Sequence, residues 1–248
     1  MPSFVKPTQT WRITNALAMF FDPVYLLFAA PGLILSMWAS YRVRTTFDAC
    51  SQIAAAHGHS GAEAAQRLLD DAGLHEVGIV ETDGYLSDHY DPTARQLALS
   101  HDVYHGRSLA AIGVACHEAG HAIQHATGYV PLGIRSVLVP TANIGSTAGY
   151  LIMAVGLMLS PWVVLLGAAV FSMVLLFQVV TLPVEFDASA RAKRLVLEAG
   201  IIDSEERDAV DRVLNAAALT YVAAAFSTLM VLAYYLFQAG FLGGSRDE

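Results

Sequence analysis

The stretch that decides the fold is SVLVPTANIGSTAGYLIMAVGLMLSPWVVLLGAAVFSMVLLFQVVTLPV, residues 136–184, which contains no charged side chain in 49 positions. A helix needs about 20 predominantly apolar residues to cross a bilayer. The run is therefore long enough for two membrane-spanning helices, and Ser160-Pro161 supplies the break between them. We expect residues 136–184 to form a transmembrane hairpin.

Two further runs are also free of charge, at 23–41 and 213–245. Charged residues make up 15% of the whole chain, against about 25% in an average soluble domain. Arg42 and Arg44 follow the first run where a signal peptide would have its cleavage site, so we interpret that run as a membrane helix. The sequence thus predicts four transmembrane helices, at about 23–41, 138–159, 162–182 and 216–240.

The positive charges indicate how these helices are oriented. Eleven of the 14 Lys and Arg residues lie in 42–135 and 191–212, two regions on the same side of a four-span topology. Lys and Arg are enriched in cytoplasmic loops, so we expect both regions in the cytoplasm and both termini outside. The predicted organisation is an N-terminal tail that is interfacial or disordered (1–22), helix 1 (23–41), a cytoplasmic catalytic region (42–135), the hairpin (136–184), cytoplasmic helices (185–213), helix 4 (214–242) and a tail (243–248).

The chemistry lies in His117-Glu118-Ala119-Gly120-His121, which fits the HExxH pattern within a run that is typical of a helix, 108–126. Residues four apart lie on one face of a helix, so both imidazoles can reach one Zn²⁺. Glu118 is then placed to take a proton from a water that the metal activates. The motif predicts metal-assisted hydrolysis. Cys116 points away from that face, and we interpret it as a buried packing residue.

The rest of the cytoplasmic region mixes helices and strands. Ser60 and Glu63 predict a capping box that begins a helix to about Ala72, and 77–81 and 96–99 alternate as short strands do. We expect a sheet of two or three strands, then the motif helix. Residues 189–200 are predicted as a cytoplasmic helix after the third span, and 204–214 as a cytoplasmic segment that leads into the fourth. The predicted fold is a mainly α membrane protein with a small α+β catalytic part.

A catalytic zinc needs a third protein ligand. His125 continues the i, i+4 series, but it lies about 12 Å along the helix axis from His117, too far to share one metal. Glu185 directly follows the third predicted span, where an unpaired carboxylate is costly. Spacing alone leaves Glu185 either a metal ligand or an interfacial residue that caps the next helix. Asp187 and Ser189 are close enough to orient Glu185 or a histidine.

Three separated segments, HEAGHAIQHATGY, LPVEFDASARA and FFDPVYLL, closely resemble the bacterial YugP-like neutral zinc metallopeptidases, over about residues 19–235. That family is related more distantly to the HtpX protease and the CAAX prenyl proteases. The resemblance implies a zincin-like, gluzincin-type fold and a single Zn²⁺ held by His117, His121 and Glu185, with Glu118 as general base. The distant relatives have Asp four residues after the ligand Glu, where this chain has Ser189. Residues 1–18 look like an extension of the family pattern.

A developing oxyanion needs a further hydrogen-bond donor, and the candidates are His89, Tyr90, His101, His105 and Tyr221. His89 is the first choice for mutation, because its loop lies between the candidate strands. We expect an extended peptide substrate to bind by adding a strand to the sheet.

The leading hypothesis is a zinc endopeptidase in the bacterial inner membrane, with its active site facing the cytoplasm. It would act on membrane or membrane-proximal proteins in contact with the lipid bilayer. The alternatives are a site-2-type intramembrane protease, for which an LDG-like motif is missing, and a non-catalytic scaffold with a structural zinc. The net charge of -8 argues against nucleic acid as a partner. The sequence leaves homo-oligomerisation and partner proteins open.

Overall fold

The structure is a computed structural model, and it describes residues 22–242. The expectations for the N-terminal tail therefore fall outside the described residues, except at Asp22. The described part is mainly helical and divides into two compact units. The bundle unit comprises residues 22–36, 138–178 and 223–242, and the site unit comprises 37–137 and 179–222.

Four long helices are apolar enough to cross a membrane among the described residues: α2 (Pro23–Ser51), α6 (Val130–Leu159), α7 (Pro161–Glu198) and α8 (Arg207–Gln238). Their number matches the four spans that the sequence predicts. Each helix continues beyond its predicted apolar run. Residues 189–200, expected as a helix of their own after the third span, largely belong to α7 instead, whereas residues 204–214 lead into the fourth span as expected, most of them as the start of α8. Pro131 lies in the first turn of α6, where the missing N–H costs nothing.

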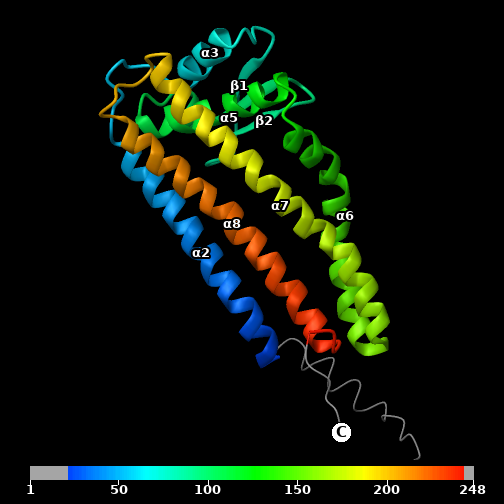
Figure 1. Cartoon of the computed structure of the whole chain (residues 1–248). Helices are drawn as coiled ribbons and strands as arrows, with labels where there is room; N and C mark the ends of the chain where they lie inside the picture. The colour runs from blue at the N-terminus through cyan, green and yellow to red at the C-terminus, as the bar shows by residue number, and fades with distance from the viewer. Residues whose placement is uncertain (1–21, 243–248) are drawn as a thin grey trace, which may run out of the picture. The chain divides into compact units, whose positions relative to one another are not determined.

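In the bundle unit, the parts of α6 and α7 lie side by side (Figure 1). Glycines permit this close approach. A Cβ built on Gly149 would lie 2.6 Å from the backbone nitrogen of Phe171, and one on Gly156 would lie 2.6 Å from that of Val164. Small residues at such contacts are typical of membrane helices, which gain stability by tight packing.

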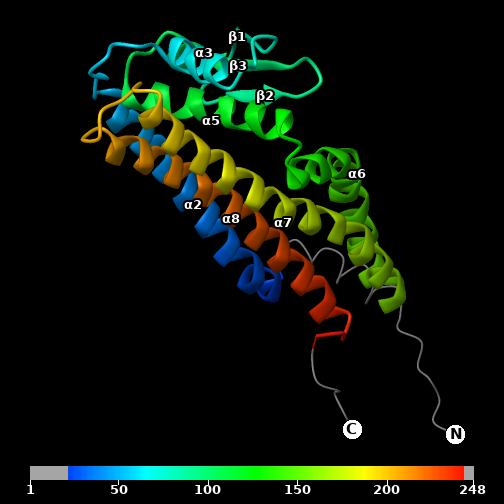
Figure 2. The same cartoon turned by 45° about the horizontal axis from the view of Figure 1, so that its top comes forward.

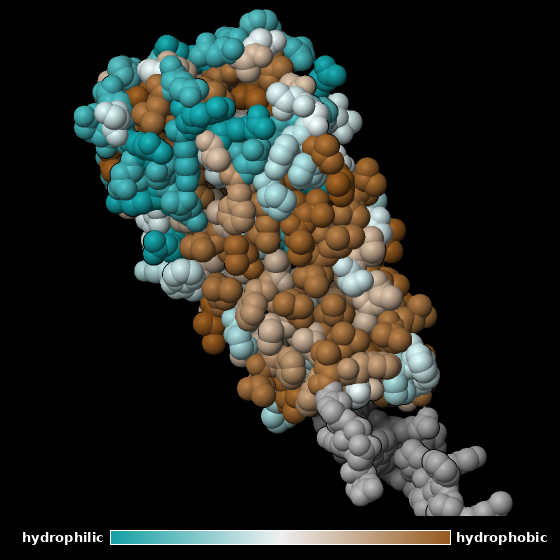
Figure 3. Space-filling model, in the orientation of Figure 1, coloured by the Kyte–Doolittle hydropathy of each residue, from teal (hydrophilic) through white to brown (hydrophobic). Residues whose placement is uncertain are grey.

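The outer surface of the bundle unit is apolar. The face of it that Figure 3 shows is largely brown, and its exposed side chains include Leu27, Leu33, Leu166 and Trp162, the last 74% exposed. Polar groups are paired: Asp22 accepts hydrogen bonds from Tyr234 (2.7 Å) and Gln238 (2.8 Å). Exposed apolar area of this extent indicates a lipid-facing surface, which agrees with the predicted spans.

The site unit contains a three-stranded sheet of order β1-β3-β2, formed by β1 (Gly78–Thr82), β2 (His89–Asp91) and β3 (Gln96–Ser100). β1 is parallel to β3, and β2 is antiparallel to it. The predicted strands at 77–81 and 96–99 are confirmed within one residue. Helix α3 (Gly61–Asp71) begins with the predicted capping box of Ser60 and Glu63.

Helix α5 (Leu109–Ala126) carries the HExxH motif through the interior of the site unit. Figure 2 shows it between the sheet and the part of α7 that belongs to this unit. All but one of its first 16 residues are buried. Its near lack of charge thus has a simple cause: its neighbours are other protein segments. Cys116 is fully buried, as expected, and burial raises the pKa of its thiol, which disfavours the thiolate that a metal would require.

Candidate metal centre

The two motif histidines meet Glu185 in the core of the site unit. Nε2 of His117 lies 3.2 Å from Oε2 of Glu185, and Nε2 of His121 lies 3.5 Å from the same oxygen. All three residues are buried, and Glu185 is 2% exposed. The structure thus brings together the three residues that the sequence singled out as ligands.

The spacing of these atoms suits a tetrahedral Zn²⁺. Ligands about 2.0–2.2 Å from a tetrahedral metal lie about 3.3–3.6 Å from one another. The distances of 3.2 Å and 3.5 Å fall close to that range. The second oxygen of Glu185, Oε1, is buried without a hydrogen bond among the described residues, although Nη1 of Arg135 lies 3.3 Å away. A dehydrated carboxylate of this kind fits a residue that binds a cation.

Gln124 determines the tautomer of His121. Its Nε2 donates to the carbonyl of Val184 (2.8 Å) and to Oδ2 of Asp187 (2.7 Å), both of which can only accept. Its Oε1 must therefore face Nδ1 of His121, 3.0 Å away, and that nitrogen must carry the hydrogen. The lone pair of His121 is left on Nε2, the nitrogen that faces Glu185. Gln124 is fully buried, and sequence reasoning missed it.

Ser189 has the same relation to His117. Its Oγ lies 3.2 Å from Nδ1 of His117, so the hydroxyl can accept from that nitrogen and leave Nε2 free for a metal. Asp187 reaches the centre indirectly through Gln124 and is held by Arg191, whose Nε donates to it over 2.6 Å. Of the two residues that were expected to support the site, Ser189 therefore contacts a candidate ligand directly, and Asp187 is connected to one through Gln124.

The electrostatics favour positive charge at this point. Burial by itself disfavours the charged form of His121, but the carboxylates of Glu185 and Glu118 outweigh it and raise the pKa of that imidazole. Arg135 is the one positive residue that the structure places against Glu185. It was also missed, although it is the only formal charge between Glu118 and Glu185 in the sequence.

Glu118 faces a cavity of about 150 Å³ that His117, Glu185 and Tyr221 also line. This volume has room for water molecules beside Glu118. The remaining wall is mostly apolar, with Phe47, Leu86, Val114, Val213 and Leu214 among its members. The carboxylate of Glu118 and the phenol of Tyr221 thus line the same half-open cavity as two of the three candidate ligands, His117 and Glu185.

Asp88 is the second carboxylate of this cavity. It accepts hydrogen bonds from the backbone nitrogen and the hydroxyl of Ser100, at 2.7 Å and 3.0 Å. Burial raises its pKa despite these bonds, and the charge of Glu118 adds to the effect. A carboxyl group that protonates more readily than usual therefore lies beside the candidate base.

The other sequence candidates lie elsewhere. His89 is on β2, where Nδ1 lies 2.9 Å from the carbonyl oxygen of Ser87, and it is absent from the lining of the cavity. Nδ1 of His125 lies 2.8 Å from the hydroxyl of Tyr90, so His125 is engaged with the sheet and not with the metal ligands. Tyr221 is the oxyanion candidate that lines the cavity.

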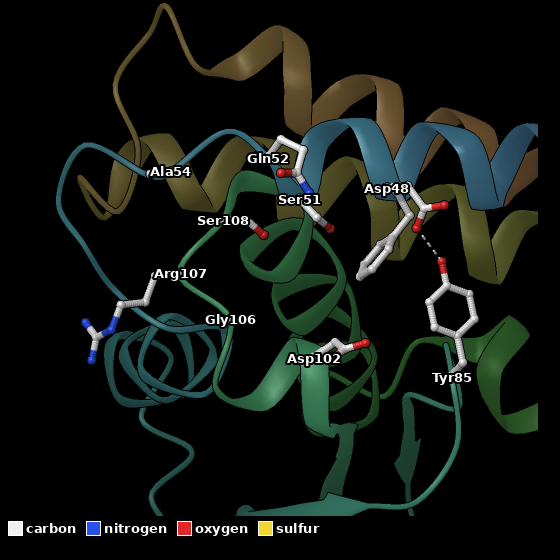
Figure 4. A pocket seen from close by; sticks show the side chains of 10 residues that line it. Asp48, Ser51, Gln52, Ala54, Tyr85, Asp102, Gly106, Arg107 and Ser108 are labelled. Carbon is white, nitrogen blue, oxygen red and sulfur yellow. Dashed lines mark hydrogen bonds between the residues drawn. The ribbon is translucent and has the colours of Figure 1, made fainter.

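A second, larger cavity of about 570 Å³ lies next to the loop 83–88 (Figure 4). There Tyr85 donates a 2.9 Å hydrogen bond to Asp48 of α2, and burial, with help from that carboxylate, raises the pKa of Tyr85 to about 12. Phe47 lines both cavities. The loop is thus tied to α2 at Tyr85 while its residues Leu86 and Asp88 line the smaller cavity.

Fold and site together define the class of the protein: a helical membrane protein with a candidate zinc centre in its core. The profile of the family described as "Putative neutral zinc metallopeptidase" matches residues 25–240, and the chain belongs to that family. The chain is also 44% identical to the "Putative membrane protease YugP" of Bacillus subtilis (strain 168) over 226 residues, which is 91% of this chain and 98% of that protein. No solved structure matches the chain significantly.

Proposed function

We propose that this protein is a membrane zinc endopeptidase in which His117, His121 and Glu185 hold one Zn²⁺ and Glu118 is the general base. The spacing of the three ligand atoms beside Glu118 is the observation that carries this proposal. Zn²⁺ at this position would act as a Lewis acid toward a substrate carbonyl and make water acidic at neutral pH. This is chemistry that the family description implies and the buried donor set fits.

The residues of the chain divide the remaining work. A carboxylate oxygen of Glu118 accepts the proton of the attacking water and returns it to the nitrogen of the leaving amine. The hydroxyl of Tyr221 lines the same cavity and is our choice as donor to the developing oxyanion. Gln124 and Ser189 hold the imidazoles of His121 and His117 with Nε2 toward the metal.

We propose that substrates are membrane proteins or membrane-proximal segments. β2 is an edge strand of the sheet, and its outer side has no strand partner among the described residues, so an extended peptide can pair with it. The mostly apolar wall of the cavity suits an apolar side chain next to the cleaved bond. The four candidate membrane-spanning helices support a substrate in or next to the bilayer.

The test of this proposal is Glu118→Gln in the full-length chain in detergent micelles, with an unfolded casein and a quenched peptide library as probes. We expect zinc content to stay at one ion and cleavage to fall by about 10²–10⁴-fold, the range that a general base contributes. Glu198→Gln is the control, because Glu198 is an exposed glutamate near the end of α7. Unchanged cleavage by Glu118→Gln would refute the mechanism.

A structural zinc in a non-catalytic scaffold predicts a different result. A scaffold would show no cleavage, and a chelator would unfold it. The enzyme would lose cleavage on chelation while its helices stay folded. Comparing the membrane proteome of cells that carry wild type with that of cells that carry Glu118→Gln extends the test. Proteins that accumulate uncut in the variant name the natural substrates.

We propose further that the protein spans the bacterial inner membrane four times with the site unit in the cytoplasm. The support is the concentration of Lys and Arg in residues 42–135 and 191–212. Alkaline phosphatase fused to the C-terminus should then be active, and a fluorescent protein at the same place should be dark. The reverse pattern would put the site outside the cytoplasm.

A further inference from the structure

A second group of metal-binding side chains lies on the surface of the site unit, and none of its members lines the cavity of Glu118. It consists of Glu81 on β1 and of His101 and His105, which begin and cap the short helix α4 (His101–Tyr104). All three are exposed, with side-chain exposures of 44%, 74% and 55%. The function proposed above makes no use of them.

The topology explains why these residues meet. β1 and β3 are parallel, and Glu81 pairs in register with Leu99, two residues before His101. The carboxyl ends of both strands therefore reach the same edge of the sheet, where α4 follows β3 directly. His101 and His105 are four residues apart, so the first turn of the chain after β3 presents both rings on one face.

The geometry is that of a two-histidine, one-carboxylate set. Nδ1 of His101 lies 2.6 Å from Oε1 of Glu81, and Nε2 of His105 lies 3.2 Å from Oε2 of the same carboxylate. The two imidazole rings are 4.9 Å apart between centroids. One ligand atom from each residue lies within 4.8 Å of the others, so small rotations of exposed side chains suffice to place all three about 2 Å from one ion.

We propose that Glu81, His101 and His105 form a second, solvent-open site for a divalent transition-metal ion. Imidazole and carboxylate suit Zn²⁺, Ni²⁺ and Co²⁺, and water would complete the coordination because the site is exposed. Binding there links the edge strand β1 to the start of α4. The buried centre has three enclosed donors, whereas this site exchanges its ion freely with solution.

Two other exposed histidines provide a matched control. His57 pairs with Asp203 and His75 pairs with Asp70, each at 3.2 Å, so each has a carboxylate partner but no second histidine. A variant that lacks both loses the same number of imidazoles and of His–carboxylate contacts as one that lacks His101 and His105. The two double variants differ in whether a shared carboxylate joins the rings.

The experiment is calorimetric titration of Ni²⁺ into the zinc-loaded, full-length protein in detergent, without a polyhistidine tag. We expect one further equivalent of Ni²⁺ to bind to wild type and to His57→Gln/His75→Gln. It should be absent from His101→Gln/His105→Gln and at least tenfold weaker in Glu81→Gln. Ni²⁺ should raise the Tm of wild type and not that of His101→Gln/His105→Gln.

Two results would overturn the proposal: no additional equivalent in wild type, or equal loss of binding in the two double variants. Tightly held zinc and casein cleavage should be the same in His101→Gln/His105→Gln as in wild type, since these residues stand apart from the buried centre. The outcome at the surface is therefore independent of whether Glu118 proves to be the general base. Circular dichroism confirms that each variant is folded, and Glu81→Gln supplies a second variant that changes only one functional group.

Discussion

Gln124→Leu provides the sharpest test of how the candidate metal centre is built. Leucine is close to glutamine in volume, so the change removes hydrogen bonds and leaves little empty space. Three bonds are lost, to Nδ1 of His121 (3.0 Å), to the carbonyl of Val184 (2.8 Å) and to Asp187 (2.7 Å). Each buried partner that is left unpaired costs about 1–3 kcal/mol.

The total loss of stability is smaller than three full penalties, because Asp187 keeps its 2.6 Å contact with Arg191. We therefore expect the free energy of unfolding to fall by about 2–4 kcal/mol. His121 would lose the acceptor that fixes its tautomer, which weakens zinc binding by about 10–100-fold. Competition with a chromophoric chelator measures the zinc affinity, and thermal melting followed by circular dichroism measures the stability.

Two further variants make the test decisive. Gln124→Glu keeps an acceptor for His121 but places a carboxylate against Asp187, so it should lose stability while its zinc affinity stays above that of Gln124→Leu. Gln66→Leu removes an exposed glutamine that donates to Asp70, and it should change stability by less than about 0.5 kcal/mol. Zinc affinity within twofold of wild type in a folded Gln124→Leu protein would refute the tautomer argument.

The remaining predictions concern packing and protonation. Gly120→Ala should destabilise the protein by about 1–3 kcal/mol in thermal melts, because its Cβ would lie 2.8 Å from a backbone oxygen of α7. Gly133→Ala is the control: a Cβ at Gly133 would have nothing within 4 Å, so this change should be neutral or stabilising. Ser189→Ala should weaken zinc binding by up to about tenfold through His117, as chelator competition would show, and an unchanged affinity would count against its orienting role. Since burial raises the pKa of Asp88, the folded state binds its proton more tightly than the unfolded chain does, and the stability contributed by this group falls as pH rises from 3.8 through the folded pKa. Between pH 4 and pH 6, the Tm of Asp88→Asn should therefore fall less with rising pH than the Tm of wild type. Parallel curves of Tm against pH would contradict this.

The sequence predicted the features that depend on composition and on regular spacing. Uncharged runs identified four apolar helices, and the capping box at Ser60 and the strands at 78–82 and 96–100 were predicted nearly in place. Helix ends were predicted poorly. The apolar signal stops at the expected membrane boundary, but backbone hydrogen bonding in α7 continues to Glu198, because charged residues extend a helix as well as apolar ones do.

For the site, the motif and the costly position of Glu185 pointed to three residues that the structure brings together. Gln124 was missed because an uncharged polar side chain gives no signal in one sequence; only its position three residues after His121 placed it on the same face. The role of Ser189 illustrates a further limit. Spacing showed that it could reach the centre, but only the fold showed that it contacts His117, while Asp187 acts through Gln124.

The close contact of α5 with α7 explains why glycine suits position 120 of the motif. The backbone of Gly120 approaches α7 so closely that a side chain there would collide with the carbonyl oxygen of Ala188. That carbonyl lies three residues after Glu185, almost one helical turn, so the same contact sets the distance between Glu185 and both imidazoles. A bulkier residue at 120 would push the helices apart and widen spacings of 3.2 Å and 3.5 Å that a tetrahedral metal requires. Gly120 in the middle of HEAGH therefore serves packing, whereas the histidines at its ends serve chemistry. The chemistry depends on the packing, because Glu185 reaches both histidines only if α5 and α7 approach each other closely at Gly120.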